Sequence, residues 1–247
     1  MGPAPAGNTT AATALDLDRV DRALATVIDP ELDEPVTDLG FVRERRVDGA
    51  DVEVHLRLPT SFCAPNFAYL MASDAQDALL AIPGIGRVRV LLDDHHDSDM
   101  INRGLAAMAG YVGTFGAEAE DGLEELRLTF QRKAHVAAME RACSKLLAES
   151  DVRVEDLHEV CLGDLPDSKE KRALLRRRTD LGVDTAPASP VLVDDRGSPI
   201  PQDAIPVKLR FAKTVRIALD GNAHFCRGLL RTRYPGSGAE QAPRAQD

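Results

Sequence analysis

The sequence has no tryptophan, few other aromatic residues, and only four cysteines among 247 residues. Four cysteines are far fewer than a disulfide-stapled secreted fold contains, so we expect a reducing, cytoplasmic environment. No apolar run approaches the length of a membrane span, which argues against a membrane protein. Residues 1–14 lack the charged start and apolar centre of a secretory signal. We expect this segment, like residues 236–247, to be a disordered tail.

Several catalytic motifs are also missing from the sequence. It contains no Gly-rich phosphate loop ending in Lys-Ser/Thr, no G-x-S-x-G turn around a nucleophilic serine, and no HExxH zinc motif. No catalytic constellation is identified, and we expect the protein not to be an enzyme.

Charge is unevenly distributed along the chain. Residues 1–130 carry 23 acidic and 10 basic residues, and the remainder carries 17 acidic and 20 basic residues. The acidic first part argues against nucleic acid as a partner. Basic residues cluster on one predicted helix: Lys169, Lys171, Arg172, Arg176, Arg177 and Arg178. This cluster is either a solvated helix face paired with acidic neighbours or a docking surface for an acidic partner.

Hydrophobic periodicity predicts an α/β (α+β) fold whose first domain covers residues 15–97. Its expected order is helix, hairpin, helix, strand. The corresponding ranges are Leu15–Val27, Phe41–Val47 with Asp51–Leu58, Pro65 to about Leu80, and Arg87–Leu92. Asp48-Gly49 supplies the hairpin turn, and Pro65 suits the first turn of a helix.

Residues 98–235 are expected to form a mainly helical second domain with one small β-hairpin. A long helix is predicted over residues 118–149 and a shorter one, capped by Ser168, over Lys169–Arg178. The hairpin is expected near residues 191–201. Val207–Leu219 fits both a strand and a helix, and its periodicity does not distinguish them.

One helix face in this second domain carries side chains that also occur in metal sites. His135, Met139 and Cys143 recur at four-residue intervals on the long helix. Such a stripe is far more often core than a ligand set, so we expect it to be buried.

Cys63 is the first candidate functional residue. It lies in a loop between a predicted strand and a predicted helix. The N–H groups and dipole at a helix N-terminus favour a thiolate, which binds soft metals or attacks electrophiles. The alternative is a small buried hydrophobic residue. The Thr-Ser-Phe-Cys-Ala-Pro loop favours a cysteine within reach of solvent.

Two further groups combine side chains that bind metals. Asp93–Asp97 contains two histidines and three aspartates, which suit iron or zinc, although a solvated acidic loop is the favoured interpretation. The pairs His158 with Cys161 and His224 with Cys226 could together form a tetrahedral site. The alternative for these pairs is buried cysteine beside locally hydrogen-bonded histidine.

Motifs in the first domain resemble a known family. The chain reads Val-Ile-Asp-Pro-Glu-Leu from Val27, Val-Thr-Asp-Leu-Gly-Phe-Val from Val36, and Leu-Pro-Thr-Ser-Phe-Cys from Leu58. A later Ile-Pro-Gly-Ile-Gly-Arg-Val-Arg-Val run starts at Ile82. In order and spacing these runs resemble the iron–sulfur cluster assembly family that includes SufT-like and PaaD-like proteins. The resemblance covers about residues 15–92.

The resemblance implies a compact α/β domain that helps to mature metalloproteins. It implies that Cys63 is the reactive loop cysteine, with Asp29, Glu31 and Thr60 at motif positions beside it. Asp38 and Gly40 also occupy motif positions; from the residues alone, Asp29 and Asp38 are equally well explained by turn chemistry. The family usually has Pro directly after its cysteine, whereas Ala64 intervenes here.

A single thiolate cannot hold an iron–sulfur cluster, which normally takes four ligands. The other ligands would come from a second copy, a partner protein, a small thiol or the C-terminal region. We therefore expect transient binding of iron or a cluster, as in an accessory factor that delivers it to a client metalloenzyme. The association of related domains with multicomponent oxygenases suggests a bacterial di-iron monooxygenase as client.

Two alternative functions remain open. One is a metal-free adaptor that only bridges partner proteins. The other is a thiol enzyme with Cys63 as nucleophile, which requires a nearby base such as His55.

Overall fold

The computed structural model describes residues 15–116, 119 and 123–236, and it divides into two compact units. Among these residues, the first unit contains 15–27 and 35–114, and the second contains 28–34 and 115–236. Helices and two small sheets confirm the predicted α+β fold with a helical C-terminal region. The predicted tails lie outside the described residues, apart from Gly236.

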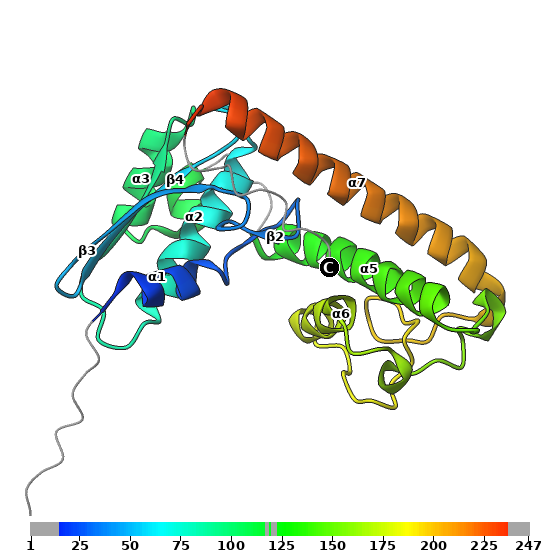
Figure 1. The fold of residues 1–247 in the computed structure, drawn as a ribbon. Helices are drawn as coiled ribbons and strands as arrows, with labels where there is room; N and C mark the ends of the chain where they lie inside the picture. The colour runs from blue at the N-terminus through cyan, green and yellow to red at the C-terminus, as the bar shows by residue number, and fades with distance from the viewer. Residues whose placement is uncertain (1–14, 117–118, 120–122, 237–247) are drawn as a thin grey trace, which may run out of the picture. The chain divides into compact units, whose positions relative to one another are not determined.

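A three-stranded sheet organises the first unit, with the strands in the order β3-β4-β5 (Figure 1). β3 (Val42–Asp48) and β4 (Asp51–Arg57) form the predicted antiparallel hairpin. Gly49 makes its turn at φ 62°, a conformation that glycine adopts without strain. β5 (Val88–Asp93) pairs with β4 in parallel, so the carboxyl ends of β4 and β5 lie at the same edge of the sheet.

Alternation along β4 gives the sheet one apolar and one polar face. Val52, Val54 and Leu56 are buried, whereas Glu53 and His55 point to the opposite face. Helix α2 (Pro65–Leu80) crosses from β4 to β5, packs against β5, and is in turn contacted by α1 (Leu17–Leu24). Each fully buried leucine or valine contributes roughly 1.5–3 kcal/mol, so this face fixes the register of the sheet.

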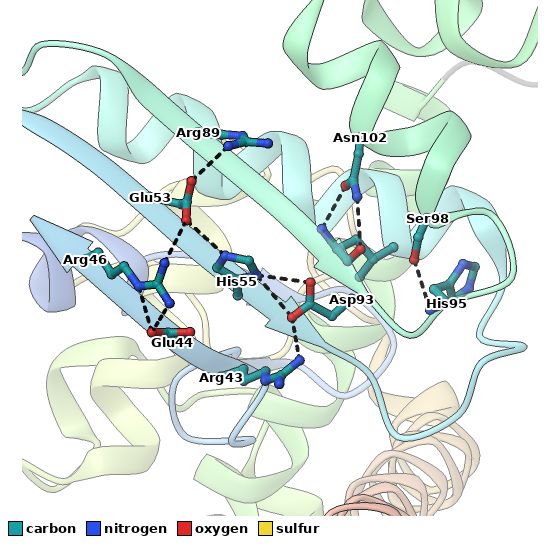
Figure 2. Close-up of polar contacts among 11 residues, drawn as sticks. Arg43, Glu44, Arg46, Glu53, His55, Arg89, Asp93, His95, Ser98 and Asn102 are labelled. Atoms are coloured by element: carbon teal, nitrogen blue, oxygen red, sulfur yellow. Dashed lines mark hydrogen bonds and ion pairs between the residues drawn. The ribbon is translucent and has the colours of Figure 1, made fainter.

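Two helices follow β5 that the sequence reading did not identify: α3 (Ser98–Ala106) and α4 (Gly110–Phe115). Helix α3 packs against β5. The Asn102 side chain accepts from Leu92 N at 2.8 Å and donates to Leu92 O at 3.1 Å (Figure 2). The first unit therefore extends to Thr114, beyond the boundary expected at residue 97.

Three helices dominate the second unit: α5 (Leu123–Glu149), α6 (Lys169–Asp180) and α7 (Ile205–Arg233). Helix α5 packs against both α6 and α7. Short 3₁₀ turns cover Val154–Asp156, Leu162–Asp164 and Gln202–Ala204. The segment whose period was ambiguous lies within α7 and is therefore helical. No helix in the described parts of the chain is long and apolar enough to cross a membrane.

Two short β elements complete the second unit and its junction with the first. Strands β1 (Ile28–Asp29) and β2 (Glu34–Pro35) pair with each other. The hairpin expected near residues 191–201 is reduced to a turn with one bridge, between Val193 and Pro199. The Asp194 N–H donates to Ser198 O at 2.9 Å and the Ile200 N–H donates to Leu192 O at 3.0 Å, so both hydrogen bonds of this bridge come from residues that flank the pair.

The core of the second unit surrounds one face of α5. Met139 and Cys143 are buried as predicted, and burial raises the pKa of the Cys143 thiol to about 12. The apolar residues of this core include Ala138, Ala142, Leu146, Leu157, Leu162, Leu174, Val191, Leu192 and Ile205. His135 is fully buried, and neither ring nitrogen has a hydrogen-bond partner among the described residues.

Arg178 departs from the solvated basic helix that the sequence suggested. It is fully buried and donates to the backbone oxygens of Asp184, Pro190 and Val191 at 2.7–3.0 Å. Its guanidinium therefore fastens the chain after α6 to this helix. Carbonyl oxygens thus satisfy both terminal nitrogens, Nη1 and Nη2, whereas the buried Nε has no hydrogen-bond partner among the described residues.

Acid should destabilise the second unit through His135. Burial and the nearby Arg178 lower the pKa of His135 from 6.5 to about 4. The unfolded chain therefore binds the proton more tightly, and stability is lost as pH falls through this range. Relative to the volume-matched His135→Leu, wild type should lose about 3 kcal/mol between pH 7 and pH 4. Urea denaturation at several pH values measures this difference.

His224→Gln is the matched control, because His224 is exposed on α7. This variant should follow the wild-type pH profile. An H135L profile parallel to that of wild type would show that His135 does not carry the effect.

Candidate functional site

Cys63 lies in the loop that joins β4 to α2, where the helix begins. Ala64 occupies the N-cap position and Pro65 the first helical position, so the inserted alanine leaves proline at the helix start. The thiol is half-buried, and its Sγ lies 3.5 Å from Thr60 Oγ1. The Phe62 N–H donates to the same hydroxyl at 3.2 Å. The structure thus brings Cys63 and Thr60 together, as the resemblance implies.

The turn after β5 contacts the Cys63 loop. His95 Nε2 lies 2.8 Å from the Cys63 carbonyl oxygen, and the His96 N–H donates to Ser61 O at 2.9 Å. The exposed Phe62 ring stacks on the His96 ring at 5.9 Å. The sequence favours interpreting Asp93–Asp97 as a solvated loop, and this is wrong for His95. The His95 side chain is buried and contacts the Cys63 loop.

Charged side chains form a network on the polar face of the sheet, shown in Figure 2. His55 Nδ1 lies 3.1 Å from both carboxylate oxygens of Asp93, and its Nε2 lies 3.2 Å from Glu53. Burial lowers the pKa of His55, but hydrogen bonds to these two carboxylates outweigh it and raise the pKa. Arginines complete the network: Arg43 pairs with Asp93, and Arg46 and Arg89 pair with Glu53. His55 is therefore held between the two carboxylates, each of which lies within hydrogen-bond distance of one ring nitrogen.

Asp29 and Glu31 belong to the second unit. Asp29 is buried, and its Oδ1 accepts the N–H groups of Glu31 at 2.9 Å and Leu32 at 2.8 Å. Burial raises the pKa of Asp29 to about 6, although these two N–H donors oppose the rise. Glu31 is exposed. The structure therefore assigns Asp29 a turn-forming role, the first of the two interpretations that its sequence allowed.

The acidic residues that follow Asp29 pair with helices of the second unit. Asp33 forms an ion pair with Arg177 of α6, and Glu34 forms one with Arg227 of α7. The first pair is nearly buried, with side chains 10% and 11% exposed. Burial raises the pKa of Asp33, while the guanidinium of Arg177 opposes that rise. Segment 28–34 is thus fastened by residues from outside the family-like region.

Asp38 and Gly40 shape the connection to β3. Asp38 is exposed and accepts from Thr37 Oγ1 at 3.3 Å. Gly40 adopts φ 77°, donates its N–H to Thr37 O at 3.1 Å, and accepts from Arg57 Nε at 3.4 Å. A side chain at Gly40 would strain this turn. Gly40 therefore shapes the backbone of this connection, and Asp38 adds a side-chain contact to Thr37.

The remaining candidate ligands lie in the second unit. His158 Nδ1 is 2.7 Å from Glu155 O, and Cys161 Sγ is 3.9 Å from Glu159 O. His224 and Cys226 lie on α7. Within the described ranges, no group of three or more His, Cys, Asp or Glu side chains is arranged to hold a metal ion. The structure does not gather these four residues into a metal site, and their metal-binding role stays a prediction.

Two contacts were not predicted from the sequence, one at the Cys63 loop in the first unit and one within the second unit. The His95 contact depends on the parallel alignment of β4 and β5, and the sequence signalled it only through the position of Asp93–Asp97 after a strand. The Arg177–Asp33 pair joins residues far apart in the chain. Both residues looked like ordinary surface charges in the sequence.

Comparisons with known proteins link the part of the chain that contains the Cys63 loop to iron–sulfur cluster assembly. Residues 17–92 match the family described as "Iron-sulfur cluster assembly protein". The chain is also 36% identical over 75 residues to the "Iron-sulfur cluster carrier protein" of Mycobacterium leprae. That alignment spans 30% of this chain and 19% of the relative. The resemblance to an iron–sulfur cluster assembly family is confirmed for residues 17–92, and it supports a general role in cluster assembly.

Neutralising Asp29 should change the pH dependence of stability. Because burial raises the pKa of Asp29 from 3.8 to about 6, folding is penalised as pH rises through this window. Asp29→Asn keeps an oxygen acceptor and removes the penalty. Relative to wild type, the variant should gain about 2.4 kcal/mol between pH 4 and pH 7. Chemical denaturation at both pH values measures this, with the exposed Asp38→Asn as the control that stays unchanged.

The Arg177–Asp33 ion pair should contribute more to stability than an exposed ion pair on the same helix. Arg177→Met leaves Asp33 buried without its cation, which should cost about 3–5 kcal/mol. Adding Asp33→Asn should recover much of this loss, as a double-mutant cycle would measure. The control is Arg172→Met, because Arg172 and its partner Asp167 are exposed. That variant should cost less than about 1 kcal/mol, and an equal cost for both arginine variants would refute the prediction.

Proposed function

We propose that this protein is a non-catalytic iron–sulfur cluster carrier or assembly factor that binds its cargo through Cys63. The observation that carries the proposal is the family match over residues 17–92, which includes the Cys63 loop. The half-buried thiol, in contact with the Thr60 hydroxyl, supports the same assignment. Thiolates are the usual protein ligands of iron–sulfur clusters.

A single protein thiolate suits a cluster that is bound transiently and then transferred to an acceptor protein. Cys63 supplies one thiolate, whereas a cluster normally takes four ligands. The others would come from a second copy of the chain, an acceptor protein or a small thiol. A cluster held by one protein ligand and several exchangeable ones is released when an acceptor offers more thiolates. The single thiolate therefore favours a transient carrier over a protein that holds its cluster permanently.

The second unit is proposed to recognise the acceptor. Residues 115–236 lie outside the matched region and add a helical body to the family-like domain. An addition of this size favours a dedicated client metalloenzyme. The di-iron monooxygenase suggested by the sequence resemblance remains the proposed client.

The two alternatives make different demands on the residues. A Cys63 thiol enzyme needs a base, and His55 directs both ring nitrogens to the carboxylates of Asp93 and Glu53. This arrangement counts against His55 as the base for Cys63. A metal-free adaptor makes no demand on the thiol, and a metal analysis distinguishes it from a carrier.

Anaerobic purification with iron and acid-labile sulfide analysis tests the proposal. Wild type should contain iron and sulfide, either as isolated or after reconstitution, and Cys63→Ala should lose most of both. Cys161→Ala is the matched control, because Cys161 is likewise half-buried but lies in the second unit. It should retain the wild-type content.

Each other outcome overturns the proposal in a defined way. Retention of the cluster in C63A together with loss in C161A would move the ligand site to the second unit. The absence of iron and sulfide from reconstituted wild type would leave the adaptor function in its place.

A further inference from the structure

The turn that follows β5 contains His95, and its hydrogen bonds indicate which ring nitrogen donates and which accepts. The Asp97 N–H donates to His95 Nδ1 at 3.1 Å, so Nδ1 is the acceptor nitrogen. The proton of the neutral ring therefore resides on Nε2, which donates to the Cys63 carbonyl at 2.8 Å. The His95 side chain is only 1% exposed. This contact is thus a partly buried hydrogen bond with a defined direction.

The start of α3 holds His95 in place. The backbone N–H of His95 donates to Ser98 Oγ at 2.9 Å, and the Ser98 N–H donates to His95 O at 3.2 Å (Figure 2). Asp94, directly before His95, adopts φ 55°, which turns the chain sharply out of β5. The histidine therefore projects from a turn that the start of α3 also holds in place.

The same turn holds the Cys63 loop at a second point. The His96 N–H donates to Ser61 O at 2.9 Å, so adjacent residues bind the carbonyls of Ser61 and Cys63. The His96 bond comes from the backbone and does not depend on its side chain. The bond from His95 comes from its ring, and a substitution can remove it alone. Substituting His95 therefore removes one hydrogen bond to the Cys63 loop, whereas substituting the His96 side chain leaves the other in place.

We propose that His95 is a positioning residue that orients Cys63 for binding and releasing its cargo. The assignment rests on the proposed function of Cys63. Without the ring N–H, the partly buried carbonyl of Cys63 loses this partner, and the loop is free to turn that peptide toward solvent. The thiol would then leave its half-buried place beside Thr60.

His95→Leu removes the N–H while keeping an apolar side chain of moderate size, and His95→Gln restores an amide N–H near the position of Nε2. The probe is the alkylation rate of each cysteine by iodoacetamide, measured by peptide mass spectrometry in the full-length apoprotein. Cys161 serves as the internal reference. In H95L, Cys63 should react about tenfold faster, the change in equilibrium that loss of one such hydrogen bond produces.

H95Q should restore a rate close to that of wild type, and His96→Leu, which keeps the backbone anchor, should leave it unchanged. Ser98→Ala loosens His95 more mildly and should accelerate Cys63 alkylation in the same direction, which keeps the test available if H95L does not fold. An unaltered Cys63 rate in folded H95L would overturn the proposal. In the absence of folded H95L, an unaltered rate in S98A would do the same. Equal rates in H95Q and H95L would also overturn it, because the hydrogen bond would then not be the acting contact.

Cluster transfer to an apo-acceptor protein separates this inference from the proposed function. H95L should slow transfer, with H95Q rescuing it. If C63A leaves iron binding intact, the carrier function fails, while the alkylation rates still report on His95. If C63A abolishes binding and H95L changes neither alkylation nor transfer, only the positioning role fails.

Discussion

Parallel pairing of β4 with β5 is the constraint on which the candidate site depends. Because both strands run in the same direction, the segments that leave them emerge at one edge of the sheet. Arg57 and Asp93 are register partners at this edge. The Cys63 loop follows one and the His95 turn follows the other. Carboxyl ends of parallel strands are a recurrent place for binding sites, since loops there meet without contributing to the core.

The two faces of the sheet have different roles. One is buried and contributes to stability, and the other carries the network of charged side chains. Val54 and Leu56 are buried on one face, which fixes the strand register through apolar packing. On the other face, His55 lies between Glu53 and Asp93. Asp93 is the last residue of β5, so this network ends one residue before the turn that carries His95. Packing thus aligns the strands, and the alignment sets where the loops begin.

Local sequence patterns predicted what depends on neighbours in the chain. Alternation in Asp51–Leu58 predicted β4, the proline at position 65 predicted the start of α2, and turn composition directed attention to Cys63. What could not be predicted depends on distant partners. Arg178 and Arg177 looked like members of a solvated basic face, yet the first lies in the core and the second pairs with Asp33. The His95 contact required the strand order, which no single segment of sequence contains.

Segment 28–34 gives the chain an interleaved organisation. It is covalently placed between α1 and β3 of the first unit, yet it is grouped with the second, where it is bound by Arg177 and Arg227. The chain therefore passes from one unit to the other more than once. Segment 28–34 belongs to the family-like region, whereas both arginines lie outside it. A substitution in α6 or α7 would therefore reach a family motif through an ion pair, although the two are far apart in the chain.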